Sequence, residues 1–230
     1  MKRLICYSLW GSNRKYTHGA VVNAESIPTV FPGWVGRFYC GQSVPADVTA
    51  ALAAAGSEVV MMNEEGDWTG MFWRFLAASD ESVEVMLSRD ADSRLSKREF
   101  DAVSEWMSSS RAFHAMRDHP LHTAVIMGGM WGVKAPLLRD IESRILQYAR
   151  GNFWQVDQNF LRDVIWPIVK DDAMVHDSFG EGLPFPGRRN GSDFVGQVVD
   201  EYEIPNKEYA DMLVAAIKKR RWGGLGRFLP

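Results

Sequence analysis

The stretch Glu84–Arg94 reads EVMLSRDADSR, an apolar run that ends in two aspartates one residue apart. Buried strands of α/β proteins end at the rim of the sheet where ligands bind, so we expect Asp90 and Asp92 in the crevice at the carboxyl end of a strand. Two carboxylates with open coordination positions suit Mg²⁺ or Mn²⁺, which accept further oxygens from substrate phosphates. The stretch therefore predicts a metal site. The alternative is a polar turn in which Asp92 or Ser93 caps a helix.

The composition is that of a globular protein. The chain has 230 residues, a net charge of -3 and 46% hydrophobic residues, which argues against a disordered segment and a strongly basic nucleic-acid binder. We expect one domain over 1–230, with a motif-bearing core over 1–187 and a C-terminal helix and tail over 188–230. Two cysteines fit a reducing, cytoplasmic location, and no apolar run is long enough to predict a signal peptide or a membrane span.

Apolar runs alternate with helical patterns along the chain. This alternation predicts an α/β fold in layers, with a mostly parallel central sheet flanked by helices. The predicted strands cover 4–9, 35–40, 57–62, 83–87, 113–116 and 123–127. The predicted helices cover 20–30, 45–55, 72–78, 97–109, 137–149, 158–168 and 207–219. We expect the helix over 158–168 to end at Pro167 or just before it.

Further short motifs accompany the two aspartates. In chain order, they are FWRF around Arg74, DAD at 90–92, RDHP around Asp118, the Gly128-Gly129 turn, DQNFL from Asp157, and His176. Their order and spacing resemble those of nucleotide-sugar glycosyltransferases of the GT-A fold, and the chain is most similar to the family 8 type. The resemblance covers roughly residues 4–187 and implies a GT-A-like layered fold.

The resemblance also implies a role for each motif. The metal, Mn²⁺ or Mg²⁺, would stabilise the departing diphosphate of a nucleotide-diphosphate sugar, the donor substrate. The implied metal ligands are Asp90, Asp92 and His176. The implied catalytic residues at the sugar and the acceptor are Asp118, Asp157 and Gln158. The implied donor-binding residues are Tyr7, Tyr16, Arg74, Gly128, Gly129 and Arg188.

Ordinary structural roles could explain the same residues. Asp157 could cap its helix, Asp118 could satisfy a turn, and Arg74 could pair with a surface carboxylate. The chain also departs from the family 8 pattern, because Leu183-Pro184-Phe185 stands where that pattern has Lys-Pro-Trp. Arg188 or Arg189 could supply the missing charge, since guanidinium groups pair with phosphate oxygens. The chain would then be a divergent branch, and the stereochemistry of transfer does not carry over.

Other function classes stay open at this point. His114, His119 and His122 could bind Zn²⁺ and serve a metal-dependent hydrolase, although Pro120 interrupts them and no His-Glu-x-x-His pattern is present. Histidines around a sugar pocket are the favoured interpretation. A nucleotidyltransferase would need a fuller Gly-rich loop than Gly11–Lys15. A non-catalytic binding module would bind neither metal nor nucleotide.

The sequence leaves the acceptor open. We expect a saccharide, while a lipid-linked, protein or modified nucleic-acid acceptor is not excluded. The tail over 218–222, with Phe228, is basic and aromatic. Its cations suit a helix C-terminus, or they could dock on anionic lipid at the inner membrane surface or on another polyanion.

Overall fold

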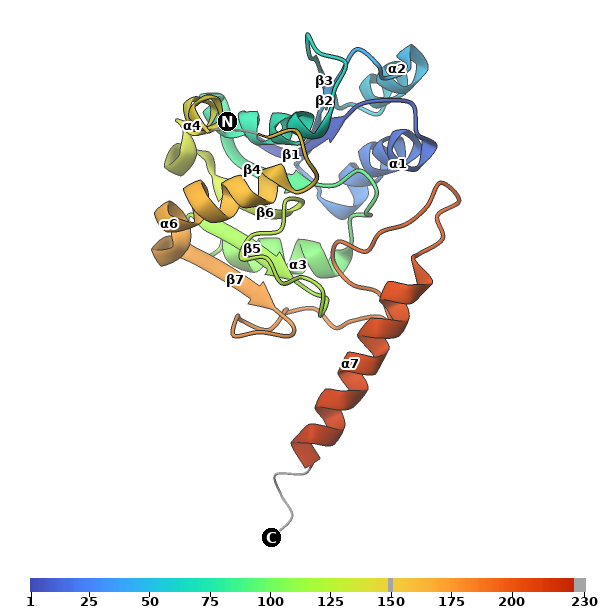
Figure 1. Ribbon diagram of the computed structural model, residues 1–230, viewed down its shortest axis with the longest axis vertical. Helices are drawn as coiled ribbons and strands as arrows, with labels where there is room; N and C mark the ends of the chain where they lie inside the picture. Colours follow the sequence, from blue (N-terminus) through green and yellow to red (C-terminus); the bar gives the residue numbers. More distant parts are fainter. Residues whose placement is uncertain (149–150, 226–230) are drawn as a thin grey trace.

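The computed structural model describes residues 1–148 and 151–225, with side chains as far as residue 220. Its centre is a seven-stranded sheet in the order β3-β2-β1-β4-β6-β5-β7 (Figure 1). The strands are β1 (Lys2–Leu9), β2 (Val35–Cys40), β3 (Glu58–Met61), β4 (Val83–Arg89), β5 (Phe113–Arg117), β6 (Met130–Lys134) and β7 (Ala173–Asp177). Only β6 runs against its neighbours, so the sheet is mostly parallel, as the sequence predicts.

Helices cover both faces of this sheet. They are α1 (Arg14–Val30), α2 (Ala46–Ala54), η1 (Trp68–Ser79), α3 (Lys97–Met107), η2 (Ala135–Leu138), α4 (Ile141–Gln147), α5 (Val156–Phe160), η3 (Leu161–Ile165), α6 (Trp166–Val169), η4 (Lys170–Asp172) and α7 (Lys207–Leu225). One large apolar cluster lies between the sheet and α1, α2 and α3, and another lies between the sheet and η1, η2, α4 and α5. The predicted layers are therefore present.

Three predictions about elements are wrong. Residues 123–127 form no strand: Ile126 fills the core from an irregular loop, and the strand follows the glycines as β6. The helix that contains Pro167 does not stop there, because a π-helical turn, η3, precedes it and Pro167 stands in the first turn of α6, where no N–H is needed. Finally, α1 begins at Arg14, six residues before the predicted start, because the Asn13 side chain accepts a hydrogen bond from the Lys15 N–H.

The C-terminal helix α7 extends away from the body of the molecule (Figure 1). Its first half is held by the buried Leu213 and by His119, whose Nε2 donates to the Tyr209 carbonyl over 2.9 Å. Arg220 donates to the Ser178 carbonyl, and its guanidinium lies 5.4 Å from the Phe179 ring centre. One tail cation is thus used within the molecule, whereas the side chains of 221–222 and all of Phe228 lie outside the described residues. No described helix is both long enough and apolar enough to cross a membrane.

Candidate active site

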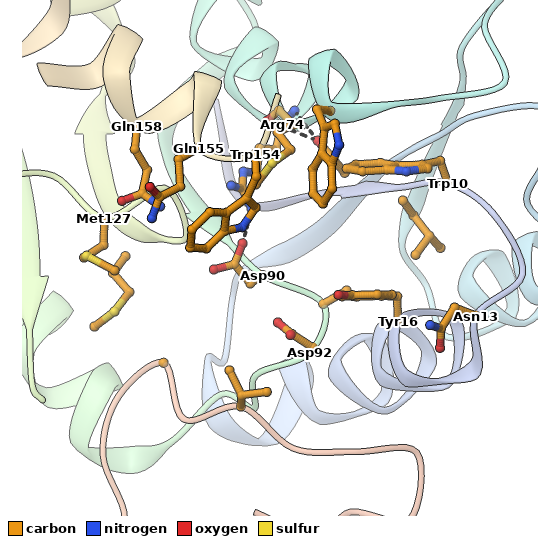
Figure 2. A pocket seen from close by; sticks show the side chains of 18 of the residues that line it. Trp10, Asn13, Tyr16, Arg74, Asp90, Asp92, Met127, Trp154, Gln155 and Gln158 are labelled. Atoms are coloured by element: carbon orange, nitrogen blue, oxygen red, sulfur yellow. Dashed lines mark hydrogen bonds and ion pairs between the residues drawn. The ribbon is translucent and has the colours of Figure 1, made fainter. Parts of the chain in front are cut away.

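A cavity of about 690 Å³ opens at the carboxyl ends of β1 and β4. The segment after β1 lines it with Trp10 and the turn that leads into α1, and the segment after β4 lines it with 90–92. Figure 2 shows Asp90 and Asp92 in the middle of this space, with Trp10 and Tyr16 to one side and Gln158 to the other. The strand-end position predicted for the two aspartates is therefore correct.

Arg74 forms the floor of the cavity. It lies on η1, whose backbone is tied to β1 because the Arg74 N–H donates to Ser8 Oγ over 3.0 Å. The guanidinium, only 4% exposed, donates to the Asp90 carboxylate through Nη1 and to Asp157 Oδ2 through Nη2 over 2.9 Å. Asp157 is fully buried, and burial raises its pKa against the attraction of Arg74. One arginine thus joins two carboxylates that lie 67 positions apart in the chain.

The second aspartate also has a cationic partner. Lys15 Nζ lies 2.7 Å from Asp92 Oδ2. Burial and the negative charge of Asp90 both raise the pKa of Asp92, which indicates that the two carboxylates lie close enough to repel each other. The Asp90 side chain remains 43% exposed and can take a further ligand.

The two carboxylates fit a hard divalent cation. Mg²⁺ is usually held by one or two carboxylates together with substrate phosphates, and Mn²⁺ also suits oxygen ligands. The part of the chain that the structure describes contains no group of three histidine, cysteine, aspartate or glutamate side chains that could hold a metal alone. A divalent cation held by Asp90 and Asp92 would therefore need further oxygen ligands, such as those of a substrate phosphate, to complete its coordination.

The Gly128-Gly129 turn packs directly against these acids. A β-carbon at Gly129 would lie 2.1 Å from Asp90 Oδ2, and one at Gly128 would lie 2.5 Å from Asp157 Oδ2. The turn is fixed on β4 because Ser88 Oγ donates to the Gly128 carbonyl over 2.7 Å. A side chain at either position would overlap Asp90 or Asp157. The two glycines therefore allow the turn to pack against these acids, although they do not line the cavity themselves.

Two other expected residues face the cavity, and three tryptophans were not expected there. Tyr16 and Gln158 line it, as do Trp10, Trp68 and Trp154. Trp154 is 65% exposed although it lines a cavity, and it precedes Gln155, which has a left-handed backbone with φ 69°. The only sequence signal for these tryptophans is the high count of nine in the chain.

Two expected site residues lie in the core. Tyr7 is fully buried on β1, and its ring stacks on Phe38 at 4.6 Å, because side chains alternate along a strand and this position faces the α1 side. His176 is fully buried on β7, three strands from β4, with Nδ1 2.8 Å from His114 Nε2. Neither residue can serve its implied role in this arrangement, and His176 is not a third ligand beside Asp90 and Asp92.

Asp118 is also used inside the protein. Its carboxylate accepts two hydrogen bonds from Arg98, each of 2.9 Å, and others from Arg189, Ser178 Oγ and the Val195 N–H. Burial raises its pKa, but Arg98 and Arg189 outweigh burial and hold the pKa below its usual value. Asp118 therefore joins α3 to the loops around Ser178 and Val195, and it does not line the cavity, where the implied catalytic role would need it.

Arg188 and Arg189 do not reach the cavity. Arg189 is committed to Asp118, and Arg188 lines a separate groove beside Lys97 and Asn190. Arg188 therefore does not lie where it could make the donor contact expected of it. Phe194 separates the two spaces, because it lines both of them.

We predict that Asp118→Asn lowers stability rather than chemistry. Breaking a buried ion pair costs about 3–5 kcal/mol, because charges are left without a partner. A lowered folded pKa stabilises the protein above the unfolded value of about 4, and this gain is lost as the pH falls through the folded pKa. In urea unfolding, the gap between parent and variant should be large at pH 7 and shrink toward pH 3. Full stability with lost turnover would restore the catalytic role of Asp118.

The three histidines that suggested zinc do not converge. His114 is buried and stacks on Trp106 at 5.2 Å, while His119 and His122 line the cavity. The zinc hypothesis is therefore not favoured. Burial lowers the pKa of His122 to about 4, and its Nδ1 accepts the Asp118 N–H over 3.1 Å. The ring is neutral at pH 7 and carries its proton on Nε2, so His122 can donate a hydrogen bond but cannot act there as a base.

Comparison with known proteins finds similarity in structure but not in sequence. No family of sequences matches the chain, and no curated protein matches it. Solved structures do match it, at low identity. A glycosyltransferase involved in glycosylation of the major capsid of PBCV-1 matches with a TM-score of 0.51 and 13% identity, over 78% of this chain and 82% of that chain. The chain has the GT-A fold.

Two further neighbours have been crystallised with ligands. Glucosyl-3-phosphoglycerate synthase from Mycobacterium tuberculosis, in a complex with Mn²⁺, UDP-glucose and glycerol 3-phosphate, has a TM-score of 0.51 and 13% identity over 82% of this chain and 72% of that chain. The mannosyltransferase PcManGT from Pyrobaculum calidifontis, with GDP-mannose and Mn²⁺, has a TM-score of 0.52 and 12% identity over 81% of this chain and 58% of that chain. Both of these neighbours thus bind Mn²⁺ together with a nucleotide sugar. The comparisons support the GT-A fold, and the expected similarity to family 8 is not confirmed.

Proposed function

We propose that the protein transfers a sugar from a nucleotide-diphosphate sugar to an acceptor, with Mn²⁺ or Mg²⁺ bound by Asp90 and Asp92. The observation that carries this proposal is the position of the two carboxylates. They stand at the carboxyl end of β4 inside a cavity of about 690 Å³, and a buried arginine holds one of them in place. The fold of metal-dependent sugar transferases supports the same conclusion.

Negative charge builds up on the diphosphate as it leaves, so positive groups close to it stabilise the transition state. A bound divalent cation would supply most of that charge as a Lewis acid. Arg74 and Lys15 add two positive charges at the same end of the cavity. Asp157 takes no direct part and acts as a positioning residue, because it holds Arg74 from the buried side.

The two sides of the cavity suit different parts of the substrates. Trp10 and Tyr16, beside the start of α1, offer flat apolar surfaces on which a nucleobase can stack (Figure 2). Gln158 and His122 offer hydrogen-bonding groups that suit sugar hydroxyls. Trp68 and Trp154 are exposed within the lining, and flat aromatic side chains of this kind suit a saccharide acceptor.

A thermal-shift panel tests this function. The panel contains nucleoside diphosphates, triphosphates and nucleotide sugars, each with and without Mn²⁺. One diphosphate and its sugar should stabilise the protein only with the metal, by about 2.7 kcal/mol at a hundredfold excess over the dissociation constant, a rise in Tm of about 5–10 °C. A response to triphosphates alone would favour a nucleotidyltransferase. No response to any nucleotide would remove the proposal.

A further inference from the structure

The two acidic side chains of the proposed metal site are each paired with a cation of the chain itself. Arg74 pairs with Asp90, and Lys15 Nζ lies 2.7 Å from Asp92 Oδ2. A divalent cation that uses both carboxylates must therefore compete with an ammonium group for Asp92. The two pairs differ in how easily they can open.

Arg74 is anchored on several sides. Apart from Asp90, it donates to Asp157 over 2.9 Å and to the Arg89 carbonyl over 3.1 Å, and it is 4% exposed. Its guanidinium can stay in place when Asp90 takes a further ligand, because these other hydrogen bonds remain. Arg74 is thus a fixed part of the site.

Lys15 is held much more loosely. Its side chain is 28% exposed, and among the described residues its one ion pair is with Asp92. The ammonium nitrogen also lies 5.2 Å from the centre of the Tyr16 ring. The ammonium group sits on a flexible four-carbon stem, so it can move without disturbing the backbone. Lys15 can leave Asp92 at the cost of that single pair.

The start of α1 adds a second argument. The first turn of this helix contains Arg14 and Lys15 and no acidic residue. Cations at a helix N-terminus are unfavourable, because the aligned peptide dipoles place partial positive charge there. Lys15 therefore depends on an anion outside the helix, and in this structure that anion is Asp92. When a metal neutralises Asp92, another anion inside the cavity can take its place.

We propose that Lys15 is a displaceable cation, which holds Asp92 while the cavity is empty and turns to the donor diphosphate when the divalent metal binds. Metal and nucleotide then strengthen each other's binding. The metal takes Asp92 and frees Lys15 for the diphosphate, and the diphosphate in turn keeps Lys15 away from Asp92. By linkage, the metal must raise nucleotide affinity by the same factor by which the nucleotide raises metal affinity. This inference rests on the proposed function and adds a donor-binding residue to it.

The test measures metal binding without turnover. Mn²⁺ binding is followed by electron paramagnetic resonance of the free ion, with the parent protein, Lys15→Met and the matched control Arg14→Met, which removes the neighbouring cation. Without nucleotide, Lys15→Met should bind Mn²⁺ roughly tenfold more tightly than the parent, because Asp92 is free, and Arg14→Met should stay close to the parent. Lys15→Gln serves as a second variant if the methionine affects folding.

The second arm repeats the titration with saturating UDP or GDP, corrected for the metal-nucleotide complex measured without protein. The factor by which the nucleotide tightens Mn²⁺ binding should be roughly tenfold smaller in Lys15→Met than in the parent. If Lys15→Met binds Mn²⁺ no better than the parent, the Lys15 proposal is wrong and the metal site stands. If none of the proteins binds Mn²⁺, with or without nucleotide, the proposed function fails as well.

Discussion

Replacing Arg74 by methionine is expected to destabilise the protein by about 3–5 kcal/mol, the range found when one partner of a buried ion pair is removed. Asp157 is fully buried and would lose its only ionic partner among the described residues. Asp90 would suffer less, because it is partly exposed to water. Urea unfolding of the parent and of Arg74→Met at pH 7 measures this loss directly.

The double variant Arg74→Met with Asp157→Asn is the matched control. Removing both charges removes the unpaired carboxylate, so most of the lost stability should return, with a coupling free energy of about 0.5–3 kcal/mol. The loss in Arg74→Met should also grow with pH. The folded pKa of Asp157 is already raised, and without Arg74 it rises further, so stability falls as the pH rises from about 4 through that folded value. Additive losses that do not depend on pH would show that Arg74 does not hold Asp157.

Asp90→Asn is expected to weaken metal-dependent nucleotide binding by about 30-fold or more, since truncating one member of a charge pair in a binding site costs roughly 2–5 kcal/mol. Folding should survive, because the amide has nearly the volume of the carboxylate and Arg74 keeps its bond to Asp157. Calorimetric titration with UDP and GDP, each with and without Mn²⁺, measures the change.

An exposed carboxylate provides the control for this second prediction. Asp171 lies on η4, and Asp171→Asn removes the same charge from the molecule at an exposed position. Its nucleotide affinity should match that of the parent. If Asp90→Asn also binds a nucleotide diphosphate with the parent's metal dependence, Asp90 is not a metal ligand.

The sequence predicts the elements that build the cavity because their signals are local. A run of apolar residues identifies β4, and the abrupt change to Asp90 and Asp92 marks its carboxyl end. The same local pattern predicts the layers and most of the strands. What a local pattern cannot predict is that the bridging guanidinium of Arg74 is buried between Asp90 and Asp157, because that pairing depends on how η1 and α5 pack.

The residues misplaced from the sequence have different causes, and for Asp118 the cause is contact over long separations. Asp118 has the residue type and spacing of a catalytic acid, but Arg98 and Arg189 approach it from 20 and 71 positions away. His176 lies in the five-residue strand β7, which is too short for an alternating pattern to stand out. Tyr7 lies before the end of β1, and its ring is stacked on Phe38 in the core between the sheet and α1, so it does not reach the cavity at the carboxyl end of the strand.

The most direct measurement is an anomalous difference map at the manganese absorption edge, from crystals grown with Mn²⁺ and the nucleoside diphosphate that stabilises the protein. The account predicts one strong peak at the carboxylates of Asp90 and Asp92, with phosphate oxygens of the nucleotide beside it and Lys15 turned away from Asp92. A bound nucleotide with no manganese peak at these carboxylates, or a peak elsewhere in the molecule, would contradict it.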